Sequence, residues 1–143
     1  MGVFDGLLGN NTKANTAKVT HELQAILIAN ETVDLAFTLI RDLVVFTNKR
    51  LIIVDKQGVT GKKSQYHSIP YRSISHFSIE TSGHFDLDAE LDIWISSAME
   101  PTIKLPFRKD DSILAIQQAL ATAVLHCELL VAEATELLGT EHT

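Results

Sequence analysis

The chain has 143 residues, 45% of them hydrophobic, and a formal net charge of −6. A chain of this length fills one hydrophobic core, so we expect one compact domain. An acidic chain lacks the basic surface that displaces counterions from phosphates, which argues against nucleic acid as the main partner.

The cysteine content and the start of the chain bear on the compartment. Cys127 is the single cysteine, so the sequence predicts neither an intrachain disulfide nor a cysteine-based zinc site. The opening MGVFDGLLGN lacks the basic and long apolar parts of a signal peptide, and no run of about 18 apolar residues follows. We therefore expect a cytoplasmic protein that does not span a membrane.

The first element expected is an N-terminal helical segment within residues 1–30. Apolar residues recur at helical spacing from Val19 to Leu27, and Asn15 or Thr16 is suited to cap the start. The pattern predicts a helix from Asn15 to about Ala29 with one apolar stripe to bury.

After residue 30, β-branched and aromatic residues are broken at short intervals by turn signals, which is typical of an antiparallel meander. In the first strand, Val33, Leu35, Phe37 and Leu39 alternate with more polar residues and are expected to share one face. The Leu-Ile-Ile-Val run at 51–54 predicts a strand buried on both sides. The expected strands are 33–39, 43–47, 50–55, 62–69, 73–81, 85–95 and 102–107.

The strand expected at 85–95 is the most regular. Its apolar residues all point one way, and the opposite, outward face carries four acids and the single tryptophan, namely Asp86, Asp88, Glu90, Asp92 and Trp94. Successive same-face residues lie roughly 7 Å apart, too far for all four acids to share one small ion. Two neighbouring acids with His76 or His84 are the alternative, but the sequence has no calcium-binding loop and no His pair at ligand spacing, so we expect no metal site. Lys104 and Arg108 on the next strand have the right parity to pair with these acids.

No Gly or Pro occurs from Asp110 to Leu138, and apolar residues step by three or four, which predicts a long amphipathic helix ending at Gly139. Cys127 lies on its apolar stripe, so a core thiol is favoured over a nucleophile. We hypothesise that the last turns extend past the domain and meet another chain.

The stretch FTNKRLIIVDKQGVTGKK, residues 46–63, gathers five bases in an acidic chain: Lys49, Arg50, Lys56, Lys62 and Lys63. Two interpretations stay open, a site for an anion and a solvated hairpin rim. The TGKK segment is not a P-loop, because Lys63 stands where Ser or Thr is required and no helix follows.

Seven strands followed by a long helix predict an α+β, mainly β, architecture. Residues 31–143 would form a bent antiparallel sheet or split barrel, with the C-terminal helix closing an open end and the N-terminal helix added outside. This arrangement resembles the pleckstrin-homology (PH) fold.

Four motifs carry a closer resemblance: TNKRL at 47–51, GVTGKK at 58–63, IPY at 69–71 and FSIET at 77–81. With them, residues 31–125 resemble the bacterial PH-like family, formerly a domain of unknown function. The resemblance implies a non-enzymatic protein without catalytic residues or cofactor. It also implies a cyclic homo-oligomer, with a pentamer as the first expectation, and a hydrophilic surface that binds other proteins.

We expect the interaction residues to form an acidic side and a basic side. The acidic side comprises Asp86, Asp88, Glu90, Asp92 and Trp94, and the basic side Lys49, Arg50, Lys62 and Lys63. A basic hairpin edge on one protomer would meet an acidic strand on the next, since a head-to-tail contact needs two complementary surfaces. The alternative is a peripheral membrane module that binds anionic lipid head groups through the same bases.

Overall fold

The computed structural model describes residues 14–57, 63–81, 88–108 and 113–126. The elements within them are α1 (Thr16–Glu22), β1 (Val33–Thr38), β2 (Asp42–Thr47), β3 (Arg50–Gln57), β4 (Lys63–Pro70), the 3₁₀ turn η1 (Tyr71–Ser73), β5 (Ile74–Thr81), β6 (Asp88–Ile95), β7 (Ile103–Arg108) and a helix at 113–126. None of the helices in this part of the chain is long and apolar enough to cross a bilayer.

Several expectations fall elsewhere in the chain. Asp86, Lys62, Cys127 and the helix predicted beyond residue 126 lie outside the described residues. For Lys56, Lys63, Asp88 and Arg108 only the backbone pairing is described: Lys56 pairs with Ser64, Lys63 with Gln57, and Asp88 with Arg108.

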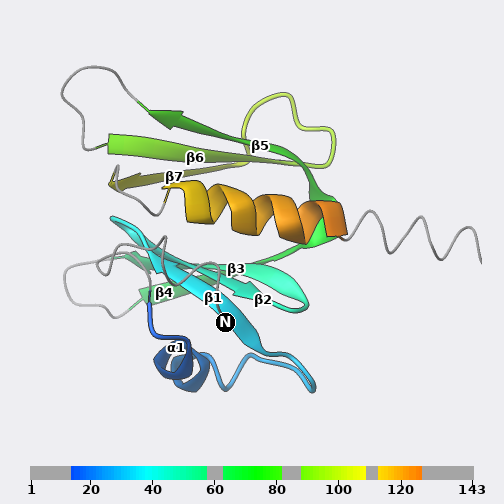
Figure 1. Cartoon of the computed structure of the whole chain (residues 1–143). Helices are drawn as coiled ribbons and strands as arrows, with labels where there is room; N and C mark the ends of the chain where they lie inside the picture. Colours follow the sequence, from blue (N-terminus) through cyan, green and yellow to red (C-terminus); the bar gives the residue numbers. More distant parts are fainter. Residues whose placement is uncertain (1–13, 58–62, 82–87, 109–112, 127–143) are drawn as a thin grey trace, which may run out of the picture.

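The strands form two antiparallel sheets that do not close into a barrel. β1-β2-β3-β4 make the first sheet and β5-β6-β7 the second, and η1 joins them between β4 and β5. In Figure 1 the helix at 113–126 lies between the two sheets, whereas α1 lies on the far side of the first sheet. The predicted PH-like architecture, mainly β with a capping helix, is confirmed.

The main core lies between the sheets and the capping helix. Phe37 and Leu51 from the first sheet, Leu91 from the second, and Ile116 and Leu120 from the helix belong to one buried cluster. A second cluster lies beneath α1. The first sheet is thus covered on both faces, and all four residues of the run at 51–54 are buried, as predicted.

The N-terminal helix is shorter than expected. Asn15 caps it as predicted, its Oδ1 accepting from the amides of Ala17 at 2.9 Å and Lys18 at 3.3 Å, but α1 ends at Glu22 and not near Ala29. Beyond it the backbone has other partners, because the Ile26 carbonyl accepts from Arg50 and the Ile28 amide donates to Glu31. The amides of Ile26 and Leu27 still donate to the Leu23 carbonyl, but the bonds from Arg50 and to Glu31 take the place of further helical turns.

The first strand departs from strict alternation. Leu35, Phe37 and Leu39 face the main core, but Val33 packs against the cluster under α1 together with Ala36. The pairing of β1 with β2 shifts register between Val33 and Leu35. A bulge of this kind moves every residue before it to the opposite face, so the expectation that Val33 shares the face of Leu35 is wrong.

Candidate functional site

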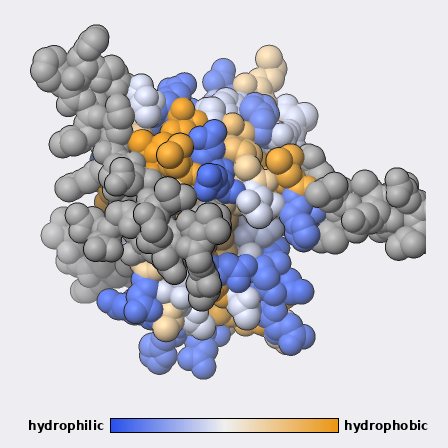
Figure 2. Space-filling view, viewed as in Figure 1, coloured by the Kyte–Doolittle hydropathy of each residue, from blue (hydrophilic) through white to orange (hydrophobic). Residues whose placement is uncertain are grey.

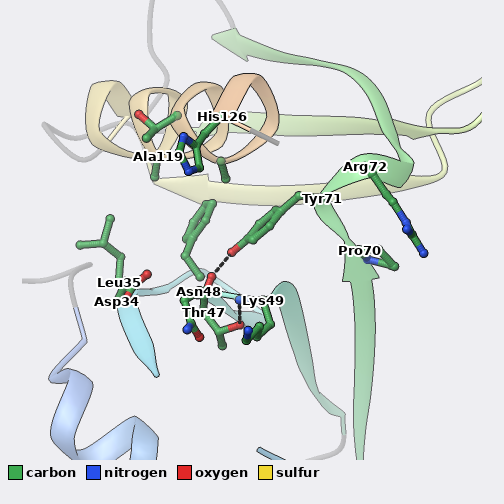
Figure 3. Close-up of a pocket in the computed structure, with 13 residues that line it drawn as sticks. Asp34, Leu35, Thr47, Asn48, Lys49, Pro70, Tyr71, Arg72, Ala119 and His126 are labelled. Carbon is green, nitrogen blue, oxygen red and sulfur yellow. Dashed lines mark hydrogen bonds between the residues drawn. The ribbon is translucent and has the colours of Figure 1, made fainter. Parts of the chain in front are cut away.

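An open cavity of about 660 Å³ lies where the start of β1, the β2–β3 turn, η1 and the capping helix meet (Figure 3). Its wall includes the buried Phe46 and Ala119 and the partly buried Leu35 and Ala123. Its exposed lining residues are Asp34, Asn48, Lys49, Pro70, Arg72, Thr122 and His126. The cavity therefore offers an apolar wall with charged and polar groups open to solvent.

Small residues on the helix make room for this cavity. Ala119 and Ala123 are four positions apart, one helical turn, and so lie on the same side of the helix. Ala115, Ile116, Leu120 and Val124 of the same helix are buried in the main core. The helix is thus held by its larger neighbours while its alanines leave the space that a larger side chain would fill.

Tyr71 joins the two sides of the cavity. Its phenolic oxygen donates a hydrogen bond of 2.6 Å to the Thr47 carbonyl, so η1 is tied to the end of β2 (Figure 3). Burial, followed by the negative charge of Asp34, raises the pKa of Tyr71 above its ordinary value, so the phenol stays protonated. The ring is a fixed part of the cavity.

The turn that presents Lys49 is held by backbone and side-chain bonds. The Asn48 amide donates to the Thr32 carbonyl at 3.1 Å, and its Oδ1 accepts from the Thr32 amide at 2.8 Å. Asn48 Nδ2 donates to the carbonyl of Asn30, whose φ of 63° places it in the left-handed region that asparagine tolerates. Lys49 is exposed at the tip of this fixed turn, at the edge of the cavity.

Arg50 has a different role from its neighbour. Its Nε lies 2.9 Å from Glu31 Oε2, one Nη donates to Glu31 Oε1 and to the Ile26 carbonyl, and the other Nη donates to Ser68 Oγ. These bonds leave few donors for an external anion, so we assign Arg50 to the fold and not to a binding surface. Lys49 and Arg50 are adjacent in sequence but serve different parts of the molecule.

Glu31 is the buried partner of this pair. Burial opposes its ionisation, but hydrogen bonds from Arg50, the Ile28 amide and the Thr47 hydroxyl outweigh that effect and lower the pKa of Glu31 to about 2. The sequence interpretation did not single out Glu31. Its position just before a strand carries no pattern that distinguishes it from a solvated acid.

The expected acidic face is only partly exposed. Asp92 lies on the expected face of the strand, but it is only 3% exposed, so the expectation that it is open to solvent is wrong. Glu90 is half-buried, and Lys104, opposite Asp92 in register, places Nζ 3.8 Å from Glu90 Oε1. Burial, then the neighbouring Asp92 and Glu80, raises the pKa of Glu90. The predicted partnership of Lys104 with these acids is confirmed.

Trp94 lies beside the acids on the outer face of β6, and it is half-buried. The imidazole of His76 stacks on its indole, with 4.3 Å between ring centroids and 21° between planes. His76 comes from β5 and pairs with Trp94 in the sheet register. The stacked pair forms a flat, partly exposed aromatic surface, a type of group that contributes strongly to protein interfaces.

The predicted interaction residues are thus not gathered in one place. Lys49 lies at the cavity, Arg50 is paired internally, and Glu90, Asp92 and Trp94 lie on the outer face of the second sheet. The cavity residues Tyr71, Arg72 and His126 were missed. The signal that could have found them is the pair of alanines on the apolar stripe of the last helix, which leaves a gap in an otherwise bulky stripe.

Comparisons with known proteins agree with this fold. A family described as the bacterial PH domain matches residues 2–124. The chain is 58% identical over 125 residues to the uncharacterized protein YjqA of Bacillus subtilis, an alignment that covers 87% of this chain and all of that protein.

Two solved structures are similar over most of their length. One is a pleckstrin homology domain from Shewanella amazonensis, with 50% identity, a TM-score of 0.68, and coverage of 78% of this chain and 99% of that one. The other is a DUF1696 family protein with a pleckstrin-homology domain from Shewanella loihica, with 47% identity, a TM-score of 0.68, and coverage of 82% and 99%.

Proposed function

Since this chain belongs to the bacterial PH domain family, we propose that it is a non-enzymatic module that assembles as a cyclic homo-oligomer and binds protein partners. The observation that carries the proposal is the cavity of about 660 Å³ between the capping helix and the first sheet. Its volume lies within the range of about 300–1,000 Å³ typical of ligand sites.

The lining favours binding over catalysis. Thr47 uses its hydroxyl to donate to Glu31 at 2.7 Å, and Tyr71 donates to a backbone carbonyl. Hydroxyls engaged in this way support the fold and are not poised to attack a substrate. The apolar wall suits a hydrophobic side chain from a partner, and the exposed Lys49 suits a carboxylate beside it, whereas the Arg72 side chain points away from the cavity (Figure 3). The occupant proposed is therefore an apolar residue of a protein segment flanked by an acid.

Ring formation would use surfaces away from the cavity. The acidic outer face of β5-β6-β7 would meet the basic β3–β4 hairpin of the next protomer, a heterologous contact of opposite charges. Lys49 and that hairpin lie at opposite ends of β3, because Arg50 pairs with Pro70 and Gln57 with Lys63. Seven residues of strand separate these ends by about 23 Å. One protomer could thus hold its neighbour and a partner together.

The capping helix adds a second apolar surface for such contacts. Leu114 and Leu125 are 59% and 56% exposed, and at eleven positions apart they lie on the same side of the helix. In the view of Figure 2, hydrophobic residues are more frequent over the region of the second sheet and the capping helix, where they stand among hydrophilic ones, than at the lower end of the molecule near α1. This asymmetry supports an interface on the upper half of the molecule as drawn.

The binding proposal is tested by filling the cavity. Ala123→Leu adds bulk to the cavity wall, and Ala121→Leu makes the same change on the same helix away from the cavity. Proteins captured from the native host by the wild type and by Ala121→Leu should be lost by Ala123→Leu. Equal capture by both variants would contradict binding in the cavity.

The assembly proposal is tested by mass. Light scattering should give about five times the 15.8 kDa of one chain. Charge reversal at Asp88 and Glu90, both to Lys, should lower this mass, and reversal of the exposed Glu100 in the β6–β7 turn should not. A wild type that stays monomeric, or a double variant of unchanged mass, would count against the ring contact proposed.

A further inference from the structure

Three carboxylates converge on the outer face of the second sheet. Glu80 on β5 pairs directly with Glu90 on β6, and Asp92 follows two residues later on the same face. One carboxylate oxygen from each of these residues can be chosen so that all three lie within 4.8 Å of one another. The group combines two neighbouring strands, and this brings the oxygens closer than one strand alone would do.

Asp92 is the unusual member of this group. It is 3% exposed, and its Oδ1 has no hydrogen-bond partner among the described residues. A buried carboxylate oxygen without a donor is costly, and native proteins rarely leave one in that state. The atom therefore indicates a ligand that would supply positive charge at this position.

The nearby protein cation does not meet this need. Lys104 Nζ lies 3.8 Å from Glu90 Oε1, and the lysine side chain is 59% exposed, so it forms a weak, solvated pair with Glu90. Among the residues that the structure describes, this is the ion pair that the group makes, and one ammonium does not balance three ionised carboxylates.

We propose that Glu80, Glu90 and Asp92 bind a divalent cation of calcium size. All three ligands are oxygens, which hard cations prefer. The three oxygens lie within 4.8 Å of one another, which is a loose cluster. Calcium accepts a flexible geometry with bonds of about 2.3–2.6 Å, whereas magnesium demands a near-ideal octahedron at about 2.0–2.1 Å, so a loose cluster of carboxylates suits calcium better.

An open cavity lies beside two of the three carboxylates. A cavity of about 460 Å³ is lined by Glu80 and Glu90, together with Arg41 from the β1–β2 turn. An ion in this opening would meet the two glutamates, and Asp92 lies two residues from Glu90 on the same face of β6. Water would complete the coordination on the open side, as is usual for calcium sites with few protein ligands.

The site is tested by isothermal titration calorimetry on the full chain after removal of metal by a chelator. Calcium chloride should bind with one ion per chain and a dissociation constant of about 10⁻⁴–10⁻³ M or tighter, the range of weak calcium modules. Magnesium chloride should bind more weakly. Absence of calcium binding at millimolar concentrations would overturn the site, and tighter binding of magnesium would overturn its assignment to a calcium-sized ion.

Matched variants locate the ion. Asp92→Asn and Glu80→Gln should each weaken calcium binding by about tenfold or more, because affinity depends on the number of charged ligands. Glu100→Gln, an exposed acid elsewhere, should leave it unchanged, and Lys104→Ala should tighten it by removing a competing cation.

Circular dichroism is used to check that each variant folds. Glu80→Gln changes an exposed side chain, so this variant keeps the test valid if Asp92→Asn unfolds. Unchanged calcium affinity in a folded Asp92→Asn or Glu80→Gln variant would show that these acids do not hold the ion, and would overturn the proposal.

Discussion

The guanidinium of Arg50 meets the carboxylate of Glu31 at two points, with Nε 2.9 Å from Oε2 and one Nη 3.0 Å from Oε1. The Glu31 side chain is 0% exposed and that of Arg50 is 22% exposed. The pair ties the segment after α1 to the start of β3. The same Thr47 that donates to Glu31 also accepts from the amides of Lys49 and Arg50, so this pair supports the turn at the edge of the cavity.

Replacing Arg50 with Ala should lower the free energy of unfolding by about 3 kcal/mol, because a buried carboxylate is left without its partner. Lys49→Ala, the neighbouring exposed base, should change it by less than about 0.5 kcal/mol. Urea unfolding followed by circular dichroism measures both. Equal effects of the two variants would mean that the pair contributes little to the fold.

The lowered pKa of Glu31 predicts how the free energy of unfolding depends on pH. Its pKa is about 2 in the folded chain and 4.5 in its ordinary state. Between these values the unfolded chain binds more protons, so the contribution of Glu31 is fully present above about pH 4.5 and is lost as pH falls towards about 2.

Glu31→Gln should remove that part of the pH dependence, whereas Glu22→Gln on the exposed side of α1 should retain it. Unfolding free energies measured across this window for the three proteins provide the test. A Glu31→Gln variant with the wild-type slope would contradict the assignment.

The alternation of apolar and polar residues predicted well which face of a strand each residue occupies, but it did not predict how buried each residue is. Leu91 and Ile93 face the core as expected, and Asp92 between them points the other way, yet Asp92 is as buried as many core residues. Parity depends on one strand alone, whereas burial depends on what the neighbouring strands place beside it. Glu80 was missed as a partner of Glu90 for the same reason, since their pairing depends on register.

Tertiary contacts explain the remaining errors. The periodicity of residues 15–29 predicted a longer helix, but it carries no sign that Arg50, more than twenty positions away, would take the Ile26 carbonyl. The bulge between Val33 and Leu35 is likewise set by pairing with β2. The cavity lies between elements far apart in the chain, so the alanine pair on the last helix indicates a gap but not which elements surround it.

The stacked pair on the second sheet offers a spectroscopic prediction. Trp94 is the single tryptophan, and His76 covers one face of its indole. His76→Ala should expose that face to water and shift the emission maximum to longer wavelength. His67→Ala, an exposed histidine on β4 in the other sheet, should leave the emission unchanged. A His76→Ala spectrum identical to that of the wild type would mean that the rings are not stacked in solution.

The hydrogen bond of Tyr71 allows the stability of the cavity wall to be tested separately from partner binding. Tyr71→Phe removes the 2.6 Å hydrogen bond to the Thr47 carbonyl but keeps the ring, so it should lower the free energy of unfolding by about 1 kcal/mol. Tyr66→Phe, which alters an exposed tyrosine on β4, should have little effect. Because η1 is no longer tied to β2, amides near the Asn48 turn should exchange hydrogen faster in Tyr71→Phe than in Tyr66→Phe. Unchanged hydrogen exchange at that turn would mean that the turn is held without the Tyr71 hydrogen bond. Partner binding should then be retained by Tyr71→Phe.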